Sequence, residues 1–283
     1  MNTLRELLKH GETQLQLGPH PDKAHPDAEL LLIHASKQNR TWLITHGDDE
    51  VNPNLAASYL DLIERRKRGE PIQYVTGEQE FYGLPFRVTP DVLIPRPETE
   101  HLVEKAIELA TGIAQPQIVD VGTGSGAIAI AVAHSLPQAQ ITALDLSAAA
   151  LDIAHENAIR NGVANRIRFL QSDLLAAVTL EKFKVVVSNP PYVPTADRDS
   201  LSVEVREHEP ALALFAGKDG LDIYRRLVPE AFAVLEAGGH LLMEIGYGQS
   251  AAIAALLEEA GFLQISFVPD LQGIPRVACA KRP

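Results

Sequence analysis

The run Asn-Pro-Pro-Tyr, from Asn189 to Tyr192, follows a short apolar segment and has the most distinctive chemistry in the sequence. Two consecutive prolines fix the backbone and remove two N–H donors, so the backbone there offers carbonyls with little freedom to move. The side chain of Asn189 adds another carbonyl. Asn189 and Pro190 could together accept both hydrogens of one NH₂ group, while Tyr192 could stack on the flat group that bears it.

This arrangement suits the methylation of a planar nitrogen. The lone pair of such a nitrogen is delocalised, and accepting its hydrogens favours the tetrahedral, partly cationic nitrogen of the transition state. The reaction needs no strong base. The rest of the rate enhancement would come from holding the nitrogen, the methyl carbon and the sulfonium sulfur of a methyl donor in line. An ordinary rigid loop is the alternative interpretation of the same four residues.

A glycine-rich segment could hold the donor. It consists of Gly122, Thr123, Gly124, Ser125 and Gly126, between a strand candidate and an apolar helix. Glycines let the backbone turn sharply and let a ligand approach closely. The spacing is one residue shorter than the dinucleotide pattern Gly-x-Gly-x-x-Gly. The segment predicts a nucleotide-like cofactor, and a merely tight strand-to-helix turn is the alternative.

Two acidic residues follow the next two strand candidates. Asp145 could accept both hydroxyls of a ribose, or it could cap the following helix, for which Ser147 competes. Asp173 could accept a hydrogen bond from an adenine amino group, or it could be a solvated loop residue. Neither residue by itself separates a methyl donor from NAD.

These residues must be positioned by a sheet. Strand candidates at 117–121, 140–144, 166–170, 185–188, 240–245, 263–268 and 276–280 alternate with helical stretches, except that no helix joins the last two. The pattern predicts an α/β fold with a doubly wound, seven-stranded, mostly parallel sheet whose last strand is antiparallel. If the first four strands have the order 3-2-1-4, the glycine loop and the Asn-Pro-Pro-Tyr loop face each other across the crevice where the winding reverses.

The chain before the sheet differs in character. Residues 1–72 show helical periodicity, at 3–9, 26–36 and 55–68, which predicts a small helical domain. Residues 73–97 contain several Pro and Gly around two short β-prone runs and predict a linker with a β-hairpin. Residues 98–283 then form the predicted catalytic domain. The basic run from Arg65 to Arg68 is read as a solvated helix end, with a contact to RNA or to an acidic partner as the alternative.

Composition limits the function classes. The chain has 283 residues, a net charge of −12 and one cysteine, Cys279. The acidic charge argues against wrapping a long duplex, and a single cysteine excludes both an intramolecular disulfide and a Cys-based metal cluster. No apolar run is long enough for a membrane span, and residues 1–10 lack a secretory signal pattern. We therefore expect a cytoplasmic, monomeric protein without a metal site.

Taken together, these motifs resemble the HemK/PrmC family, the protein-(glutamine-N5) methyltransferases that modify the Gln of the Gly-Gly-Gln motif in peptide-chain release factors. The resemblance covers nearly the whole chain. Besides the glycine loop and Asn189–Tyr192, the segments that show it are 74–77, 80–83, 93–100, 208–210 and 216–222. Within 93–100, Pro-Arg-Pro-Glu-Thr-Glu separates this family from the related enzyme for ribosomal protein L3, which usually has a Ser-Pro pair in place of Pro-Glu.

The resemblance implies a Rossmann-like class I fold, the cofactor S-adenosyl-L-methionine with S-adenosyl-L-homocysteine as product, and a helical domain that docks the release factor. It assigns the cofactor to Gly122–Gly126, Asp145 and Asn189, and the glutamine to Asn189, Pro190, Pro191 and Tyr192. We add Asp173 and Leu174 to the cofactor set. Leu174 departs from the aromatic residue that family members often have there to cover the adenine. Arg96 and Glu98 could line the site directly. Alternatively, Arg96 pairs with a carboxylate to anchor the linker, and Glu98 or Thr99 begins a helix.

Three other functions remain open at this point. One is a non-catalytic binding module, in which an intact Asn189 would have no evident purpose. A nucleic-acid amino-methyltransferase acting on adenine-N6 or guanine-N2 could use the same Asn-Pro-Pro-Tyr run, although the acidic charge and the lack of a basic recognition domain argue against it, and no direct nucleic-acid substrate is expected. A dehydrogenase would need the longer glycine spacing. A cytosine-C5 enzyme would need a cysteine nucleophile near the fourth strand, where Cys279 does not lie.

Overall fold

The computed structural model describes residues 2–283. The chain forms two compact units. The first, called here the helical unit, contains the chain up to Gly77 together with Leu201–His208; the second, the sheet unit, contains Glu78–Ser200 and Glu209–Pro283. The boundary after Gly77 falls inside the predicted linker, whereas the sequence did not predict that 201–208 would join the helical unit.

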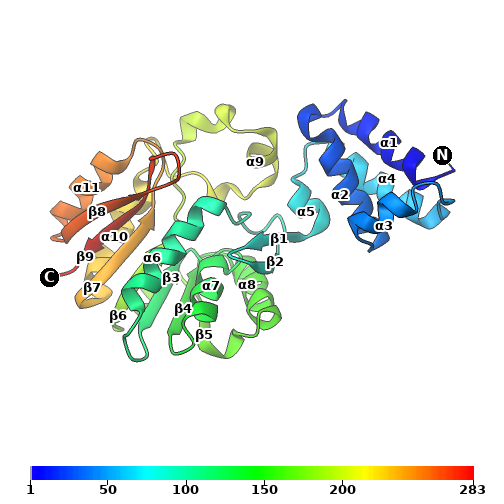
Figure 1. Cartoon of the computed structure of the whole chain (residues 1–283). Coiled ribbons are helices and arrows are strands. Elements are labelled where there is room, and N and C mark those ends of the chain that lie inside the picture. Colours follow the sequence, from blue (N-terminus) through cyan, green and yellow to red (C-terminus); the bar gives the residue numbers. More distant parts are fainter. Residues whose placement is uncertain (1) are drawn as a thin grey trace. The chain divides into compact units, whose positions relative to one another are not determined.

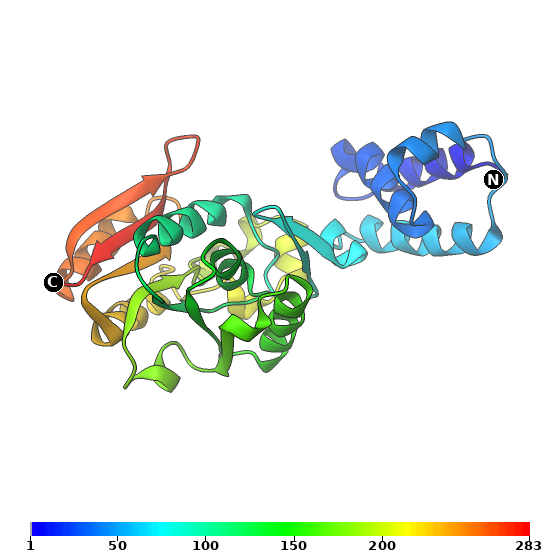
Figure 2. The same ribbon diagram turned by 60° about the horizontal axis from the view of Figure 1, so that its bottom comes forward.

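The helical unit is built from amphipathic helices. Its elements are α1 (Leu4–Leu15), α2 (Ala24–Ser36), α3 (Arg40–Thr45), α4 (Pro53–Lys67), α5 (Ile72–Thr76) and α9 (Val203–His208). Figure 2 shows α1, α2 and α4 side by side, and their leucines form a common core around the buried Tyr59. Tyr59 packs over Gly11, where any larger residue would collide with the phenol. The three predicted helices are confirmed, while the short α3 and α5 were not predicted.

The basic run at the end of α4 corrects one expectation. Arg66 is not solvated: its side chain is 2% exposed and pairs with Asp27 of α2 at 2.7 Å and with Glu204 of α9. Arg65 pairs with Glu70. A buried guanidinium needs such partners because an unpaired charge in the protein interior is costly. The run therefore includes an internal ion pair that attaches α9 to the helical unit.

The sheet unit contains seven strands in the order β5-β4-β3-β6-β7-β9-β8. The strands are β3 (Gln117–Val121), β4 (Gln140–Asp145), β5 (Ile167–Gln171), β6 (Phe183–Ser188), β7 (Leu235–Glu244), β8 (Leu263–Pro269) and β9 (Pro275–Lys281). The first five pair in parallel, and β9 is antiparallel to both of its neighbours. The predicted seven strands, the order of the first four and the antiparallel last strand are confirmed.

Helices cover both faces of this sheet (Figure 1). On one face, α6 (Glu100–Ala110), α7 (Ala127–Ser135) and α8 (Ala148–Arg160) pack on residues such as Ile118 and Val187. On the other, α10 (Asp222–Val234) and α11 (Ser250–Glu259) pack on residues such as Val119 and Val186. Neighbouring residues of one strand thus serve opposite layers, which is the alternation of a strand buried on both sides.

The predicted β-hairpin is also present. Strands β1 (Glu78–Phe81) and β2 (Leu84–Arg87) pair antiparallel across a turn at Tyr82 and Gly83. The rings of Phe81 and Phe86 are buried in the same apolar layer as α6 and α7. The hairpin therefore belongs to the core of the sheet unit.

Candidate active site at the carboxyl ends of the strands

The loop between β3 and α7 has the backbone that only glycine adopts readily. Gly122, Gly124 and Gly126 all have positive φ, between +55° and +82°. A Cβ on Gly122 or Gly124 would meet no atom within 4 Å, because both residues face an open cavity, whereas a Cβ on Gly126 would collide with Ile130 and Ala154. The first two glycines thus leave space for a ligand, called here the glycine cradle, and the third lets α7 and α8 pack closely.

Asp120, in β3 just before this loop, supports the turn from below. Its Oδ2 accepts hydrogen bonds from the hydroxyl of Thr123 at 2.7 Å and from the backbone N–H of Ala129 at 3.2 Å. Complete burial raises the pKa of this carboxyl to about 7, against the lowering effect of its two hydrogen bonds. The sequence did not single out Asp120, although it is the one acidic residue among the apolar residues of β3.

Asp145 ends β4 beside the glycine loop. Its carboxylate accepts hydrogen bonds from the backbone N–H of Gly124 at 2.8 Å and of Ser147 at 2.9 Å. Ser147 itself caps α8 by accepting from Ala150, so Asp145 is not the N-cap. Burial raises the pKa of Asp145, and the two backbone N–H groups oppose that shift. The carboxylate lines the cavity with lone pairs still available for further donors.

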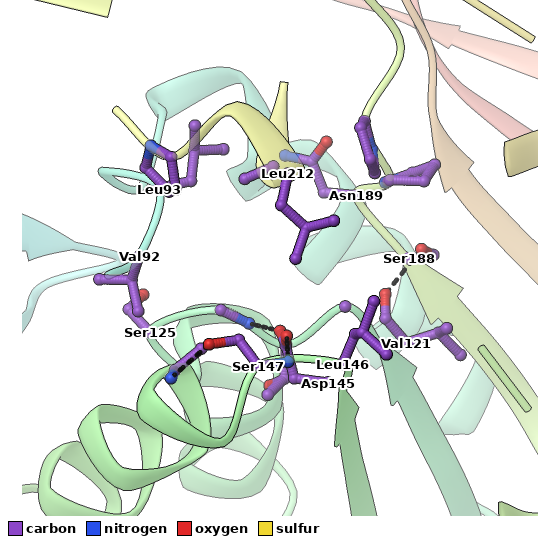
Figure 3. Close-up of a pocket in the computed structure, with 18 of the residues that line it drawn as sticks. Val92, Leu93, Val121, Ser125, Asp145, Leu146, Ser147, Ser188, Asn189 and Leu212 are labelled. Carbon is purple, nitrogen blue, oxygen red and sulfur yellow. Dashed lines mark hydrogen bonds between the residues drawn. The ribbon is translucent and has the colours of Figure 1, made fainter. Parts of the chain in front are cut away.

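The cavity has a volume of about 340 Å³ and lies over the carboxyl ends of β3, β4, β5 and β6. Figure 3 shows Asp145 and Ser147 on one side of it and Asn189 on the other, with Leu212 between them. The predicted site residues that line it are Gly122, Thr123, Gly124, Ser125, Asp145, Asp173, Leu174, Asn189, Pro190 and Pro191. Gly126 and Tyr192 are not among the lining residues of the described chain.

Asp173 and Leu174 are adjacent in this wall but differ in environment. Asp173 forms an ion pair with Arg226 of α10 at 2.8 Å, with both side chains about half exposed. Leu174 has a φ of +48°, an uncommon conformation for a residue with a side chain, and it packs against the apolar layer of α10 and α11. Leu146 and Leu174 give this part of the cavity an apolar surface.

The Asn-Pro-Pro-Tyr loop leaves the sheet next to the glycine loop because β6 pairs with β3. Ser188 anchors its start by donating a hydrogen bond to the carbonyl of Val121 at 2.7 Å. Asn189 donates from Nδ2 to the hydroxyl of Thr99 at 3.1 Å. Tyr192 directs its hydroxyl toward Glu244 at 3.4 Å. The loop is thereby attached to segments that lie far away in the sequence.

Thr99 and Glu244 were not identified from the sequence. Thr99, just before α6, was expected at most to begin that helix, but its side chain makes no capping hydrogen bond and instead donates to Glu244 at 2.6 Å. Glu244, the last residue of β7, is 3% exposed, and burial raises its pKa to about 6. Its position at the end of a central strand was the available signal.

Arg96 has both of the roles that the sequence suggested for it. It lines the cavity, and it also forms an ion pair with the buried Glu209. Glu98 is not among the lining residues of the described chain. The segment 91–96 forms one wall of the cavity, which consists of Asp91, Val92, Leu93, Pro95 and Arg96. Part of the predicted linker therefore also lines the cavity.

Two protein-family models match this chain. A model of the methyltransferase small domain matches residues 99–206, and a model of the PrmC N-terminal domain matches residues 6–77. Among solved structures, a methyltransferase from Pyrococcus furiosus superposes with a TM-score of 0.54 at 18% identity, covering 71% of this chain and 90% of that one. At this identity the likeness shows a shared methyltransferase fold only.

Sequence relatives are closer. A release factor glutamine methyltransferase of Koribacter versatilis is 44% identical over 257 residues, 90% of each chain. One of Deinococcus radiodurans is 44% identical over 281 residues, 99% of this chain and 98% of that one. Both the helical unit and the sheet unit are covered by the second match. The chain belongs to the release factor glutamine methyltransferase family.

Proposed function

We propose that this chain transfers a methyl group from S-adenosyl-L-methionine to the side-chain amide nitrogen, N5, of the Gln in the Gly-Gly-Gln motif of peptide-chain release factors. The observation that supports it most is the joint placement of Asn189 and the glycine cradle on one cavity. A methyl acceptor and a methyl donor could meet there. We also propose that the protein is a monomer and acts in the cytoplasm.

The residues present fit the cofactor. Gly122 and Gly124 leave the space that a Cβ would fill, Asp145 offers carboxylate lone pairs to ribose hydroxyls, and Leu146 and Leu174 offer an apolar surface for the adenine. When bound, S-adenosyl-L-methionine supplies the electrophilic sulfonium methyl and leaves as S-adenosyl-L-homocysteine. The chain's own task is to hold the glutamine amide against it.

Asn189 and Pro190 would perform that task. The side-chain carbonyl of Asn189 and the backbone carbonyl of Pro190 each accept one hydrogen of the glutamine NH₂ group, which directs its nitrogen toward the cradle. These acceptors bind more strongly as positive charge develops on the nitrogen, so they favour the transition state over the ground state. Once the nitrogen–methyl bond has formed and the methyl–sulfur bond has broken, the cationic nitrogen would release one of its two protons to water, which restores a neutral amide. A contact of Pro191 with the glutamine remains part of the proposal. Tyr192, which was expected to stack on the glutamine, does not line the cavity and would instead act through its hydrogen bond to Glu244.

The decisive experiment presents the 283-residue chain with radiolabelled S-adenosyl-L-methionine and one of three substrates: a release factor, the same factor with Gln replaced by Asn in Gly-Gly-Gln, or total RNA and DNA. We expect label in the first factor and none in the matched variant. Label in nucleic acid with none in the release factor would contradict the proposal.

Asn189→Ala tests the residue itself. We expect turnover to fall roughly 10²–10³-fold, the order found when one transition-state hydrogen-bond donor or acceptor is removed, while the dissociation constant for S-adenosyl-L-homocysteine changes much less. Steady-state kinetics and calorimetry on the folded variant separate these quantities. Turnover close to that of the unaltered chain would remove Asn189 from the proposed role.

A further inference from the structure

We propose that Thr99 and Glu244 act as positioning residues that set which end of the Asn189 side-chain amide faces the substrate. The inference rests on the proposed function, because it concerns the orientation that a glutamine amide would require. It depends on a chain of hydrogen bonds within the sheet unit, running from Glu244 through Thr99 to Asn189. All three residues come from different segments of the chain.

The amide of Asn189 has two ends of similar size and opposite chemistry. Its oxygen accepts hydrogen bonds and its nitrogen donates them, so the two flipped orientations occupy the same space but offer opposite surfaces. Only the oxygen can accept a hydrogen of a glutamine NH₂ group. With the nitrogen forward, two donors would face each other, and the proposed grip would fail. Something in the protein must therefore select the orientation.

Thr99 makes this selection through the single proton of its hydroxyl. A hydroxyl has one proton to donate and two lone pairs with which to accept. The hydroxyl of Thr99 lies 2.6 Å from Oε2 of Glu244 and donates its hydrogen bond to this carboxylate, which can only accept. Toward Asn189, 3.1 Å away, Thr99 can then present only a lone pair. The nitrogen of Asn189 must point to Thr99, which leaves its oxygen for the cavity.

Glu244 can maintain this direction of hydrogen bonding because it is buried and hydrogen-bonded. Its side chain accepts from Thr99 and from the hydroxyl of Tyr192, and its backbone carbonyl accepts from the hydroxyl of Tyr224 at 2.7 Å. Both Glu244 and Thr99 are less than 5% exposed, so water does not compete for these bonds. The same contacts tie Tyr192, at the far end of the Asn-Pro-Pro-Tyr run, to the acceptor that orients Asn189.

The arrangement predicts a dependence on pH. Protonated Glu244 could donate to Thr99, which would free the Thr99 proton to point at Asn189 and remove the preference for one orientation. The pKa of Glu244 is raised to about 6, chiefly by burial. The groups that face Glu244 are Glu98, which raises this pKa, Thr99, Tyr192 and Arg276, which lower it, and Tyr224, which bonds to its backbone carbonyl. Activity that depends on this order should decline as the pH falls through about 6.

Thr99→Val tests the hydroxyl at nearly constant volume. We expect kcat for release factor methylation to fall roughly 10-fold, the order of one hydrogen bond, with little change in affinity for S-adenosyl-L-homocysteine. Thr99→Ser, which keeps the hydroxyl, should restore kcat. The matched control is Thr142→Val, which removes another buried hydroxyl, bonded to Arg168 at 3.0 Å in the same unit; its kcat should not change. A Thr99→Val enzyme with the kcat of the unaltered chain would overturn the inference.

Glu244→Gln tests the same order through pH. A glutamine can still accept from Thr99 through its oxygen, but it cannot titrate, so the decline of kcat near pH 6 should be absent from its profile. Superimposable profiles of the two proteins would contradict the inference, and this comparison decides the matter if Thr99→Val does not fold.

A readout without turnover separates this inference from the proposed function. Neutron diffraction from crystals of the unaltered chain and of Thr99→Val distinguishes the amide nitrogen of Asn189 from its oxygen and shows which of them faces residue 99. We expect the nitrogen to face Thr99 in the unaltered chain, and the orientation to be mixed or reversed in the variant. An amide orientation that is the same in both proteins would refute the positioning role even if no release factor is methylated, whereas methylation failing in the unaltered chain alone would refute the proposed function.

Discussion

At the level of single residues, the two carboxylates beside the glycine loop differ in whether they can still bind a ligand. Asp120 is enclosed and bonds to Thr123 and Ala129, so it supports the loop from inside. Asp145 also bonds to the loop, through Gly124, but it lines the cavity. Since the N-cap of α8 is Ser147, the capping interpretation of Asp145 is excluded, and ribose binding stays as its predicted role.

Asp145→Ala should weaken the binding of S-adenosyl-L-homocysteine by about 1.5–3 kcal/mol, the value of a hydrogen bond to a charged group. Isothermal titration calorimetry measures the change. Asp152→Ala, which removes an exposed carboxylate from the neighbouring helix α8, should leave the affinity unaltered. Equal affinities for Asp145→Ala and the unaltered chain would show that Asp145 only holds the loop.

At the level of elements, the strand-loop-helix unit of β3 and α7 must meet two steric demands at once. Gly122 and Gly124 keep space open for a ligand, whereas Gly126 allows the close packing of α7 against α8. All three have positive φ, so every substitution there is strained, but only at Gly126 does a new side chain also collide with the core.

Gly126→Ala should therefore destabilise the fold more than Gly162→Ala. Gly162 has a φ of +70° and open space around it, so alanine there incurs only the left-handed strain of about 1–2 kcal/mol. At Gly126 the contact with Ile130 and Ala154 should add about 1–3 kcal/mol. Urea unfolding of both variants gives the difference, and equal losses would show that the helices move apart without cost.

Asp120 makes the stability of the same element sensitive to pH. Its pKa in the folded chain, about 7, lies above the ordinary value of 3.8 for an aspartate, so the folded state binds the proton more tightly than the unfolded state. Stability from this group is therefore fully present below about pH 4 and is lost as the pH rises toward 7.

Asp120→Asn removes this titration. Relative to the variant, the unaltered chain should lose a few kcal/mol of unfolding free energy between pH 4 and pH 8. Chemical denaturation of both proteins across that range, without cofactor, measures it. Parallel curves would show that Asp120 does not titrate in the folded chain.

At the level of the whole molecule, the segment Leu201–His208 joins the helical unit although the chain on both sides of it belongs to the sheet unit. The Asn-Pro-Pro-Tyr loop precedes this segment, and Pro210, Leu212 and Ala213 of the cavity wall follow it. The chain therefore connects the two units by three crossings instead of one. Arg66, bonded to Asp27 and to Glu204, attaches the inserted segment.

Arg66→Ala should destabilise the helical unit by about 3–5 kcal/mol, because the buried Asp27 loses its counter-ion and the partly buried Glu204 loses one of its partners. Hydrogen exchange should also speed up in residues 201–208. Arg68→Ala, an exposed position in the same basic run, provides the control and should have little effect on either measurement. Unchanged exchange in 201–208 with Arg66→Ala would show that other contacts are sufficient to hold α9.

The sequence by itself determined the sheet and the loops that line the cavity at the ends of β3, β4, β5 and β6. Strands and loops of a parallel sheet are contiguous in the chain, so their periodicity and their glycine, proline and acidic residues remain visible as motifs. For this reason the strand segments, the glycine loop and the positions of Asp145 and Asn189 could be predicted before the fold was known, whereas the order of the first four strands was an assumption that the fold confirms.

Only the tertiary structure decided which side chains act together across long separations. Thr99 and Glu244 are 145 residues apart, Arg66 and Glu204 are 138 apart, and Arg96 and Glu209 are 113 apart. Each partner alone resembles a helix start, a solvated charge or a strand end, because an isolated side chain contains no record of the segment against which it will pack. Their roles depend on burial and on the direction of a shared proton, and both of these arise only when the chain has folded.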